Sequence, residues 1–119
     1  MVEKERYNKR IASFMELRDL QKRKLDFDME RGWDKSRASN VFVHLIEELG
    51  EIGKHVSYEE GYKKSNSGHT PNLSVEELKR EFAQVLMLFL QLSNHYSIDL
   101  EKSFKEELEI MEKRFNIRQ

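Results

Sequence analysis

Apolar side chains recur at steps of three and four residues along four stretches of the chain, with charged residues between them. This spacing places apolar residues on one face of an α-helix, whereas a half-buried strand requires strict alternation, which the second stretch does not show. The pattern predicts amphipathic helices over residues 3–30, 36–62, 74–95 and 100–115. The sequence therefore predicts an all-α fold.

Capping residues mark the starts of three of these helices. Asp34 or Ser36 can cap the second helix, after Gly32 and Trp33 interrupt the first. Ser74 with a glutamate three residues later forms a capping box for the third helix. Asp99 can cap the fourth. Between the second and third helices, residues 61–72 are polar and turn-rich, and this segment predicts a mobile loop, the one candidate for a lid.

The predicted third helix is apolar around most of its circumference. Met87, Leu88 and Leu90 add to a stripe that already contains Leu78, Phe82, Val85, Leu86, Phe89 and Leu92. A helix of this kind must be covered on nearly every side, and a chain of 119 residues needs a second copy of itself to do that. We therefore expect a homo-oligomer, either a homodimer or a homotetramer.

Length and composition narrow the classes of protein. The 119 residues fit a single domain, residues 1–119, and 21 basic against 22 acidic side chains leave a formal charge of -1. Such a chain has no global basic field, so a nucleic-acid polymer is not an expected partner. The absence of cysteine excludes disulfides and thiol chemistry and is compatible with a cytoplasmic location. The longest apolar run, residues 85–90, is far shorter than the roughly 20 residues of a membrane span.

Carboxylates interrupt the apolar stripes of the second and third predicted helices. Glu48 and Glu51 follow the stripe of the second helix, and Glu81 falls on that of the third. Carboxylates gathered in a water-poor groove repel one another unless a cation or shared protons compensate them. Oxygen-rich clusters of this kind suit Mg²⁺ or Mn²⁺. The sequence therefore predicts a divalent metal site between these two helices.

Four ordered motifs together resemble the MazG-like all-alpha nucleoside triphosphate pyrophosphohydrolases. They are ERGWD at 30–34, LIEELGE at 45–51, EFAQVL at 81–86 and SIDL at 97–100, and the resemblance covers roughly residues 14–116. It implies a four-to-five-helix bundle of that family's type, completed by oligomerisation. It also implies Mg²⁺-dependent hydrolysis of a nucleoside triphosphate, ribo or deoxy, to the monophosphate and pyrophosphate, which serves house-cleaning or control of the nucleotide pool.

The resemblance also assigns roles to individual residues. In that family an E-x-x-E on one helix and an E-x-x-D on the next bind the Mg²⁺ that holds the triphosphate. Glu48 and Glu51 match the first motif, Glu81 matches the start of the second, and Glu47 matches an adjoining acidic position. Gln84 stands where an aspartate is expected, and its amide oxygen can ligate a metal without adding charge. The implied general base is Glu48 or Glu51.

The resemblance also indicates which residues contact the substrate, and it shows where this chain departs from the family. Trp33 either plugs the end of the core or stacks on a nucleobase, and the two uses are compatible. Lys54 and Lys79 are candidates for triphosphate contacts, although solvated helix charges are the alternative. In the fourth helix Glu107 and Met111 stand where family members often have Lys and Asn, so the phosphate-facing side is altered.

Two other functions remain open at this point. The first is a nucleotide- or metal-binding protein of the same fold with weakened catalysis, for which Gln84, Glu107 and Met111 are the motivation. The second is a structural helical oligomer, supported by the apolar third helix. His44 lies four residues before Glu48, but a di-iron bundle would need paired E-x-x-H motifs, which the sequence lacks.

Overall fold

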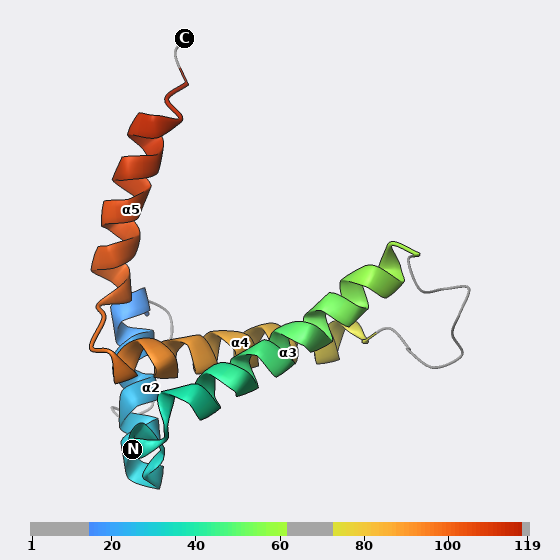
Figure 1. Cartoon of the computed structure of the whole chain (residues 1–119), viewed down its shortest axis with the longest axis horizontal. Coiled ribbons are helices and arrows are strands. Elements are labelled where there is room, and N and C mark those ends of the chain that lie inside the picture. Colours follow the sequence, from blue (N-terminus) through green and yellow to red (C-terminus); the bar gives the residue numbers. More distant parts are fainter. Residues whose placement is uncertain (1–14, 62–72, 118–119) are drawn as a thin grey trace, which may run out of the picture.

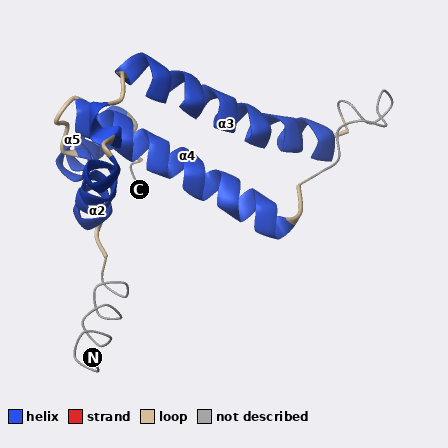
Figure 2. Cartoon of the chain, turned by 90° about the horizontal axis from the view of Figure 1, so that it is seen from below, coloured by secondary structure: helices blue, strands red, loops and turns tan. Residues whose placement is uncertain are grey.

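The computed structural model describes residues 15–61 and 73–117, and within these two ranges every regular element is a helix (Figures 1 and 2). The elements in chain order are α2 (Leu17–Arg31), the short 3-10 helix η1 (Trp33–Lys35), α3 (Ala38–Glu59), α4 (Val75–His95) and α5 (Leu100–Arg114). The predicted all-α class is therefore confirmed for the described part of the chain. None of these helices is both long and apolar enough to cross a bilayer.

The predicted caps of the last two helices are present. The Ser74 hydroxyl accepts a hydrogen bond from the Glu77 backbone N–H at 3.1 Å, and the Glu77 carboxylate accepts one from the Ser74 N–H at 3.2 Å. At the start of α5, the Asp99 carboxylate accepts the Lys102 N–H at 3.1 Å. Each bond satisfies a backbone donor that the first helical turn leaves free, so local sequence alone sets where these helices begin.

The predicted cap of α3 is wrong. Asp34 lies inside η1, Ser36 follows it, and the N-cap is Arg37, whose side chain makes no capping bond. The physical reason is η1 itself, in which the Ser36 N–H bonds to the Trp33 carbonyl at 3.1 Å and closes a separate turn. The chain leaves that turn extended, so α3 begins two residues later than expected.

Two sequence predictions fall outside the described residues. They are the first half of the predicted N-terminal helix and nearly all of the loop predicted over residues 61–72. The part of the first helix that is described differs from its prediction in one respect. Its buried side chains are Gln21, Lys24 and Asp28, whereas the apolar Leu17 and Leu20, whose three-residue spacing contributed to the helix prediction, are only partly buried. The interior surface of α2 is thus polar and relies on hydrogen bonds.

Helices α3 and α4 form an antiparallel hairpin, α2 lies across one end of it, and α5 leads away from that end (Figures 1 and 2). Over residues 15–61 and 73–117, only Val41, Leu45 and Leu90 are buried apolar side chains. The radius of gyration is 18.5 Å, compared with roughly 13 to 14 Å for a compact domain of this length. Over the two described ranges the helices therefore form an open arrangement rather than a closed bundle.

A buried glutamine joins α2 to the turn between α4 and α5. The Gln21 amide donates to the Ser93 hydroxyl at 3.2 Å and to the Ile98 carbonyl, and its oxygen accepts the Leu100 N–H at 3.1 Å. The Asn94 amide donates to the Gln21 backbone carbonyl at 3.1 Å. These four bonds, together with the ion pairs of Arg18 with Asp99 and Glu101, tie the start of α5 to α2.

Candidate functional site

The predicted carboxylates lie along the seam between α3 and α4. Glu48 is partly buried on the side of α3 that also carries the buried Leu45 and His55, and Glu81 is partly buried on α4. Glu51 lies one turn after Glu48 and is also partly buried. Helical spacing brings the first pair to the seam, and hairpin packing brings α4 alongside them.

Glu81 is the carboxyl group most altered by this arrangement. Its pKa is raised to about 7, first by a hydrogen bond with Glu48, then by burial and by the negative charges of Glu48 and Glu51. The charge of Arg80 acts in the opposite direction. A hydrogen bond between two carboxyl groups requires a proton on one of them. Glu48 and Glu51 are thus close enough to influence the ionisation of Glu81.

One oxygen in this cluster has no partner. Glu81 Oε2 is buried and makes no hydrogen bond. In the described part of the chain, no other side-chain oxygen or nitrogen is both buried and without a hydrogen-bond partner. A buried acceptor left unpaired costs about 1 to 3 kcal/mol, so such an atom marks a place where something is missing or strain is tolerated.

The other two carboxylates have partners on their own helix. Glu48 Oε1 lies 3.4 Å from His44 Nε2, and Glu51 Oε1 lies 3.4 Å from Lys54 Nζ. Among residues 15–61 and 73–117, no three His, Cys, Asp or Glu side chains converge on a common point as metal ligands do. The predicted ligands are therefore neighbours whose side chains do not form a closed coordination shell.

Two further predicted ligands occupy different positions. Gln84 is partly buried and lies one turn after Glu81, on the same side of α4. Glu47 is exposed, and on an α-helix it is turned about 100° from Glu48. The structure thus brings Gln84 to the seam and leaves Glu47 on the outer surface of α3.

A hollow of about 320 Å³ continues the seam toward α2. Its lining includes Trp33, Asn40, His44 and Gln91. His44 joins it to the carboxylates, because the same imidazole contacts Glu48. The Trp33 side chain is about half exposed, at 49%, so its ring is available to a ligand in this hollow.

Sequence reasoning missed a buried ion pair beside the tryptophan. Lys24 Nζ, which also lines the hollow, donates to the Asp28 carboxylate, and the two side chains are only 7% and 1% exposed. The ammonium lies 5.8 Å from the centre of the Trp33 ring. A lysine four residues before an aspartate normally indicates a solvated helix pair. The signal available was the polar stripe that Gln21, Lys24 and Asp28 form at helical spacing.

The two lysines expected at the triphosphate lie in different surroundings. Lys54 is beside Glu51, at the edge of the cluster. Lys79 pairs with Glu76 at 3.4 Å, and because it precedes Glu81 by two residues it lies on the opposite side of α4. The structure therefore brings one of the two lysines to the carboxylates.

Comparison with known proteins does not assign the chain to a family. No protein-family model, no curated protein and no solved structure matches the chain.

Proposed function

We propose that this protein is a Mg²⁺-dependent nucleoside triphosphate pyrophosphohydrolase of the MazG-like type, with Mn²⁺ as a possible substitute. It would convert a ribo- or deoxyribonucleoside triphosphate to the monophosphate and pyrophosphate. The observation that carries this proposal is the seam, where Glu81 has a raised pKa and an unpaired buried oxygen beside Glu48 and Glu51. The four sequence motifs support it independently.

The residues at the seam fit a hard divalent cation. Mg²⁺ is bound by oxygen atoms, and three carboxylates with the Gln84 amide supply only oxygen donors. The unpaired Glu81 Oε2 is a donor that no protein group uses. Glu48, Glu51, Glu81 and Gln84 are therefore the residues that would hold the cation. When bound, Mg²⁺ neutralises phosphate charge and lowers the pKa of coordinated water.

The protein's own groups account for the proton transfer. Water attacks the α-phosphorus, the bond between that atom and the bridging oxygen breaks, and pyrophosphate leaves with that oxygen. The proton of the attacking water passes to a carboxylate, a role that we assign to Glu48 or Glu51. Glu81 has a raised pKa and holds a proton more readily than an ordinary glutamate when no cation is bound.

The hollow beside the seam suits the nucleoside. Its volume of about 320 Å³ lies at the lower end of the range for small-molecule sites, roughly 300 to 1,000 Å³. The exposed Trp33 ring can stack on a base, and the amides of Asn40 and Gln91 can hydrogen-bond its edge. Lys54, which pairs with Glu51, is the lysine that we assign to the phosphate chain.

A screen over the common ribo- and deoxyribonucleoside triphosphates tests this function. Phosphate release is followed by malachite green with Mg²⁺ or Mn²⁺, with and without added inorganic pyrophosphatase. We expect release that needs both the metal and the added enzyme, because the product is pyrophosphate. Glu48→Gln should abolish it, whereas Glu60→Gln at the exposed end of α3 should leave it unchanged. Turnover that persists undiminished in Glu48→Gln would contradict the assignment.

The alternative is a nucleotide- or metal-binding protein of the same type with weakened catalysis. Gln84 favours it, because an amide in place of a carboxylate lowers the charge of the cluster by one unit. Metal-dependent nucleotide binding in calorimetry, without pyrophosphate release for any triphosphate, would select this alternative.

A further inference from the structure

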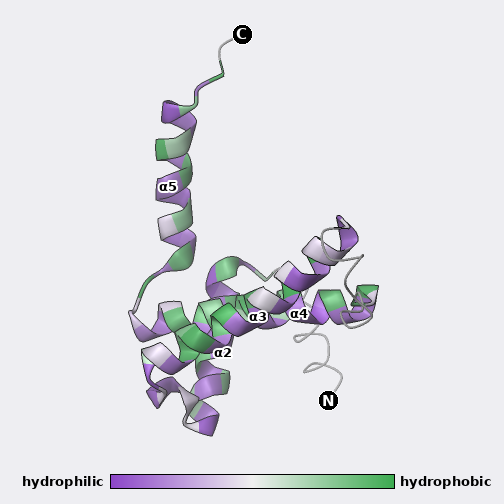
Figure 3. Cartoon of the chain, turned by 45° about the vertical axis from the view of Figure 1, so that its right-hand side comes forward, coloured by the Kyte–Doolittle hydropathy of each residue, from purple (hydrophilic) through white to green (hydrophobic). Residues whose placement is uncertain are grey.

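One end of the α3–α4 hairpin has no hydrophobic core. The buried apolar side chains of the described ranges, Val41, Leu45 and Leu90, lie in the first half of α3 and the last half of α4, which meet beside α2 (Figure 2). At the other end, where α3 ends and α4 begins, the last turns of α3 are mostly hydrophilic (Figure 3). We call this the open end. Contacts other than apolar packing must hold the two helices together there.

A buried histidine provides such a contact. The His55 side chain is only 9% exposed, and both of its ring nitrogens have partners. Nδ1 accepts a hydrogen bond from the Leu73 backbone N–H at 3.1 Å, and Nε2 lies 3.1 Å from Glu59 Oε2. Apart from the contact of Glu48 with Glu81, no other hydrogen bond or ion pair in residues 15–61 and 73–117 joins α3 to the segment 73–95. His55 therefore ties the end of α3 to the residue before the cap of α4.

The two partners determine the protonation state of the imidazole. A backbone N–H can only donate, so Nδ1 carries a lone pair and no proton. An ionised carboxylate can only accept, so Nε2 carries the proton and donates it to Glu59. The bonded geometry thus requires a neutral His55. An imidazolium has an N–H at both nitrogens and would turn one of them against the Leu73 N–H.

The titratable groups that face His55 are nearly all acidic. They lie one turn away on α3 or on the seam side of α4, and they are Glu51, Tyr58, Glu59, Glu77 and Glu81. Their negative charges favour a proton on the imidazole, whereas burial and the Leu73 N–H oppose it. Protonation of His55 therefore costs the bond to Leu73 but gains favourable interactions with these carboxylates.

We propose that His55 is a pH-sensitive latch at the open end of the hairpin. The neutral imidazole holds Leu73 and keeps the start of α4 against the end of α3. Uptake of a proton from solvent at Nδ1 breaks this bond and releases the start of α4. The Nε2–H bond to Glu59 is kept and becomes an ion pair. In the described ranges, no buried apolar side chain lies at the open end to hold the two segments in place of the lost bond.

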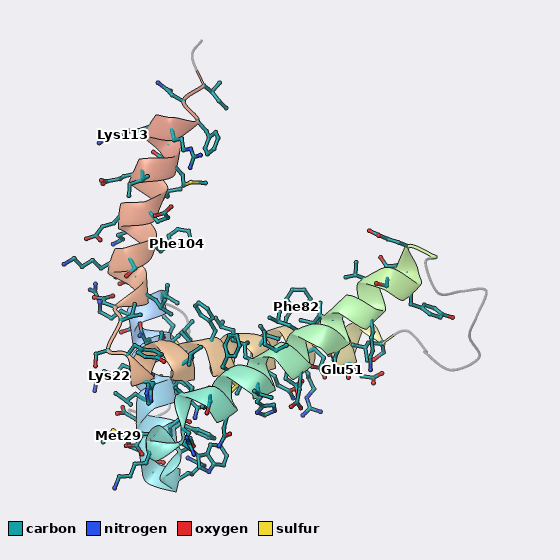
Figure 4. All side chains as sticks on the ribbon, viewed as in Figure 1. Lys22, Met29, Glu51, Phe82, Phe104 and Lys113 are labelled. Carbon is teal, nitrogen blue, oxygen red and sulfur yellow. The ribbon has the colours of Figure 1, made fainter. Side chains whose placement is uncertain are left out.

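Release changes how the helices approach each other and leaves the helices themselves intact. The capping box of Ser74 and Glu77 uses only residues within the first turn of α4, so α4 begins at the same residue in both states. Glu51 lies toward the open end, away from Lys22 of α2 (Figure 4). The latch therefore lies at the carboxylate end of the seam. The inference does not depend on the proposed catalytic function, because neither bond of His55 involves Glu48, Glu51 or Glu81.

Magnetic resonance of the isotope-labelled full chain, without metal or nucleotide, tests the latch. The ring nitrogens of His55 should show the Nε2–H tautomer at about pH 8 and the imidazolium at about pH 5, which bracket the ordinary histidine value of about 6.5. Over the same range the Leu73 amide should lose about tenfold of its protection from hydrogen exchange. The Leu78 amide bonds to the Ser74 carbonyl at 2.8 Å within α4 and should keep its protection.

Three variants separate the hydrogen bond from the charge. His55→Asn places an amide oxygen near the position of Nδ1 but cannot take up a proton, so Leu73 should stay protected in both acid and base. His55→Phe keeps a ring without an acceptor, so Leu73 should be unprotected in both. The matched control is His95→Gln, which removes an exposed histidine from α4 and should behave like the parent.

Other results overturn the proposal. A proton on Nδ1 of His55 in base, or Leu73 protection that acid does not change, would exclude the latch. An equal loss at Leu78 would mean that acid melts the whole turn, and the same acid response in His55→Asn would assign the change to another group. If a variant fails to fold or to protect Leu73, the parent decides. In the latch, Leu73 protection falls with the same midpoint as that at which the His55 imidazolium forms, and separate midpoints would contradict it.

Discussion

At the residue scale, the clearest electrostatic effect of the seam is the raised pKa of Glu81. Its carboxyl group is more easily protonated than an exposed glutamate, because Glu48, burial and Glu51 all disfavour its charge. In an unfolded chain none of these causes operates. The folded protein therefore holds a proton at Glu81 in a pH range where the unfolded chain has released it.

This difference predicts that the metal-free protein loses stability as pH rises from 4.5 to about 7. In that window the folded state binds more protons than the unfolded state, so the free energy of unfolding falls with pH and levels off above it. We expect a loss of about 1 kcal/mol after solvent screening. Urea unfolding across the window measures it. The same slope in Glu81→Gln would show that another group is responsible.

Removing a carboxylate should weaken metal binding. We expect Glu51→Gln and Glu81→Gln each to lower Mg²⁺ or Mn²⁺ affinity about tenfold or more, because divalent affinity depends on the number of charged oxygen ligands. Isothermal titration measures the affinity, with Glu60→Gln as the control for loss of one surface charge. Unchanged affinity in both seam variants would rule out a shared cation site.

Gln84 allows the converse experiment, in which charge is added. Gln84→Asp should tighten Mg²⁺ binding about tenfold and raise any hydrolytic rate, provided that the shorter side chain reaches the cation. Gln84→Glu is the control for length. The competing view is that the amide donates a hydrogen bond that orients Glu48 or Glu51, so that an acid adds repulsion. If neither acidic variant binds metal better than the parent, charge at this position does not limit the site.

At the scale of elements, a buried amide joins the turn between α4 and α5 to α2. Gln21 supplies bonds to both sides of the turn, and within that turn Ser97 adopts a positive φ of 53°. A non-glycine residue in this region is held there by its surroundings. The direction of α5 is therefore a property of contacts with α2.

Gln21→Leu should destabilise the fold by about 2 to 3 kcal/mol, because the Leu100 N–H and the Ile98 carbonyl lose their bonds to the Gln21 amide in a partly buried site. Chemical unfolding measures this loss. The control is Gln91→Leu, which removes a single exposed bond of 3.2 Å to the Trp33 carbonyl and should cost less than about 0.5 kcal/mol. Equal losses of unfolding free energy in the two variants would show that the Gln21 hydrogen bonds stabilise the fold no more than the exposed bond of Gln91.

At the scale of the molecule, the balance between buried and exposed apolar surface is unusual for a chain of this length. Three buried apolar side chains in the described ranges provide little of the driving force for folding, while twenty large ones are substantially exposed. Association would supply the missing burial. Folding and assembly should then be linked.

This linkage predicts that the thermal midpoint rises with protein concentration, because mass action favours a folded oligomer over unfolded chains. Melting followed by circular dichroism over a hundredfold range of concentration, on the order of micromolar to 0.1 mM, should shift the midpoint by several degrees. Ile46→Glu should abolish the dependence and lower the midpoint at every concentration. A midpoint independent of concentration in the parent would contradict it.

Several features followed from the sequence because their physics is local. Helical periodicity predicted the helices, and the capping box at Ser74 and the cap at Asp99 were confirmed because a cap needs only residues within one turn. The same periodicity placed Glu48, Glu51 and Glu81 on inward stripes, and these residues are neighbours at the seam. The assignment to a pyrophosphohydrolase family, and with it Mg²⁺ and a nucleotide, remains a prediction.

Other features depended on groups distant in the sequence, and only the tertiary structure decided them. In the sequence, Lys24 and Asp28 have the spacing of a solvated ion pair. In the structure the pair is buried, and the Trp33 ring of η1 lies beside the Lys24 ammonium. Periodicity could show that apolar surface exceeded what one chain covers, but not which side remains open. That side depends on how α3, α4 and α5 pack, and packing is a long-range property.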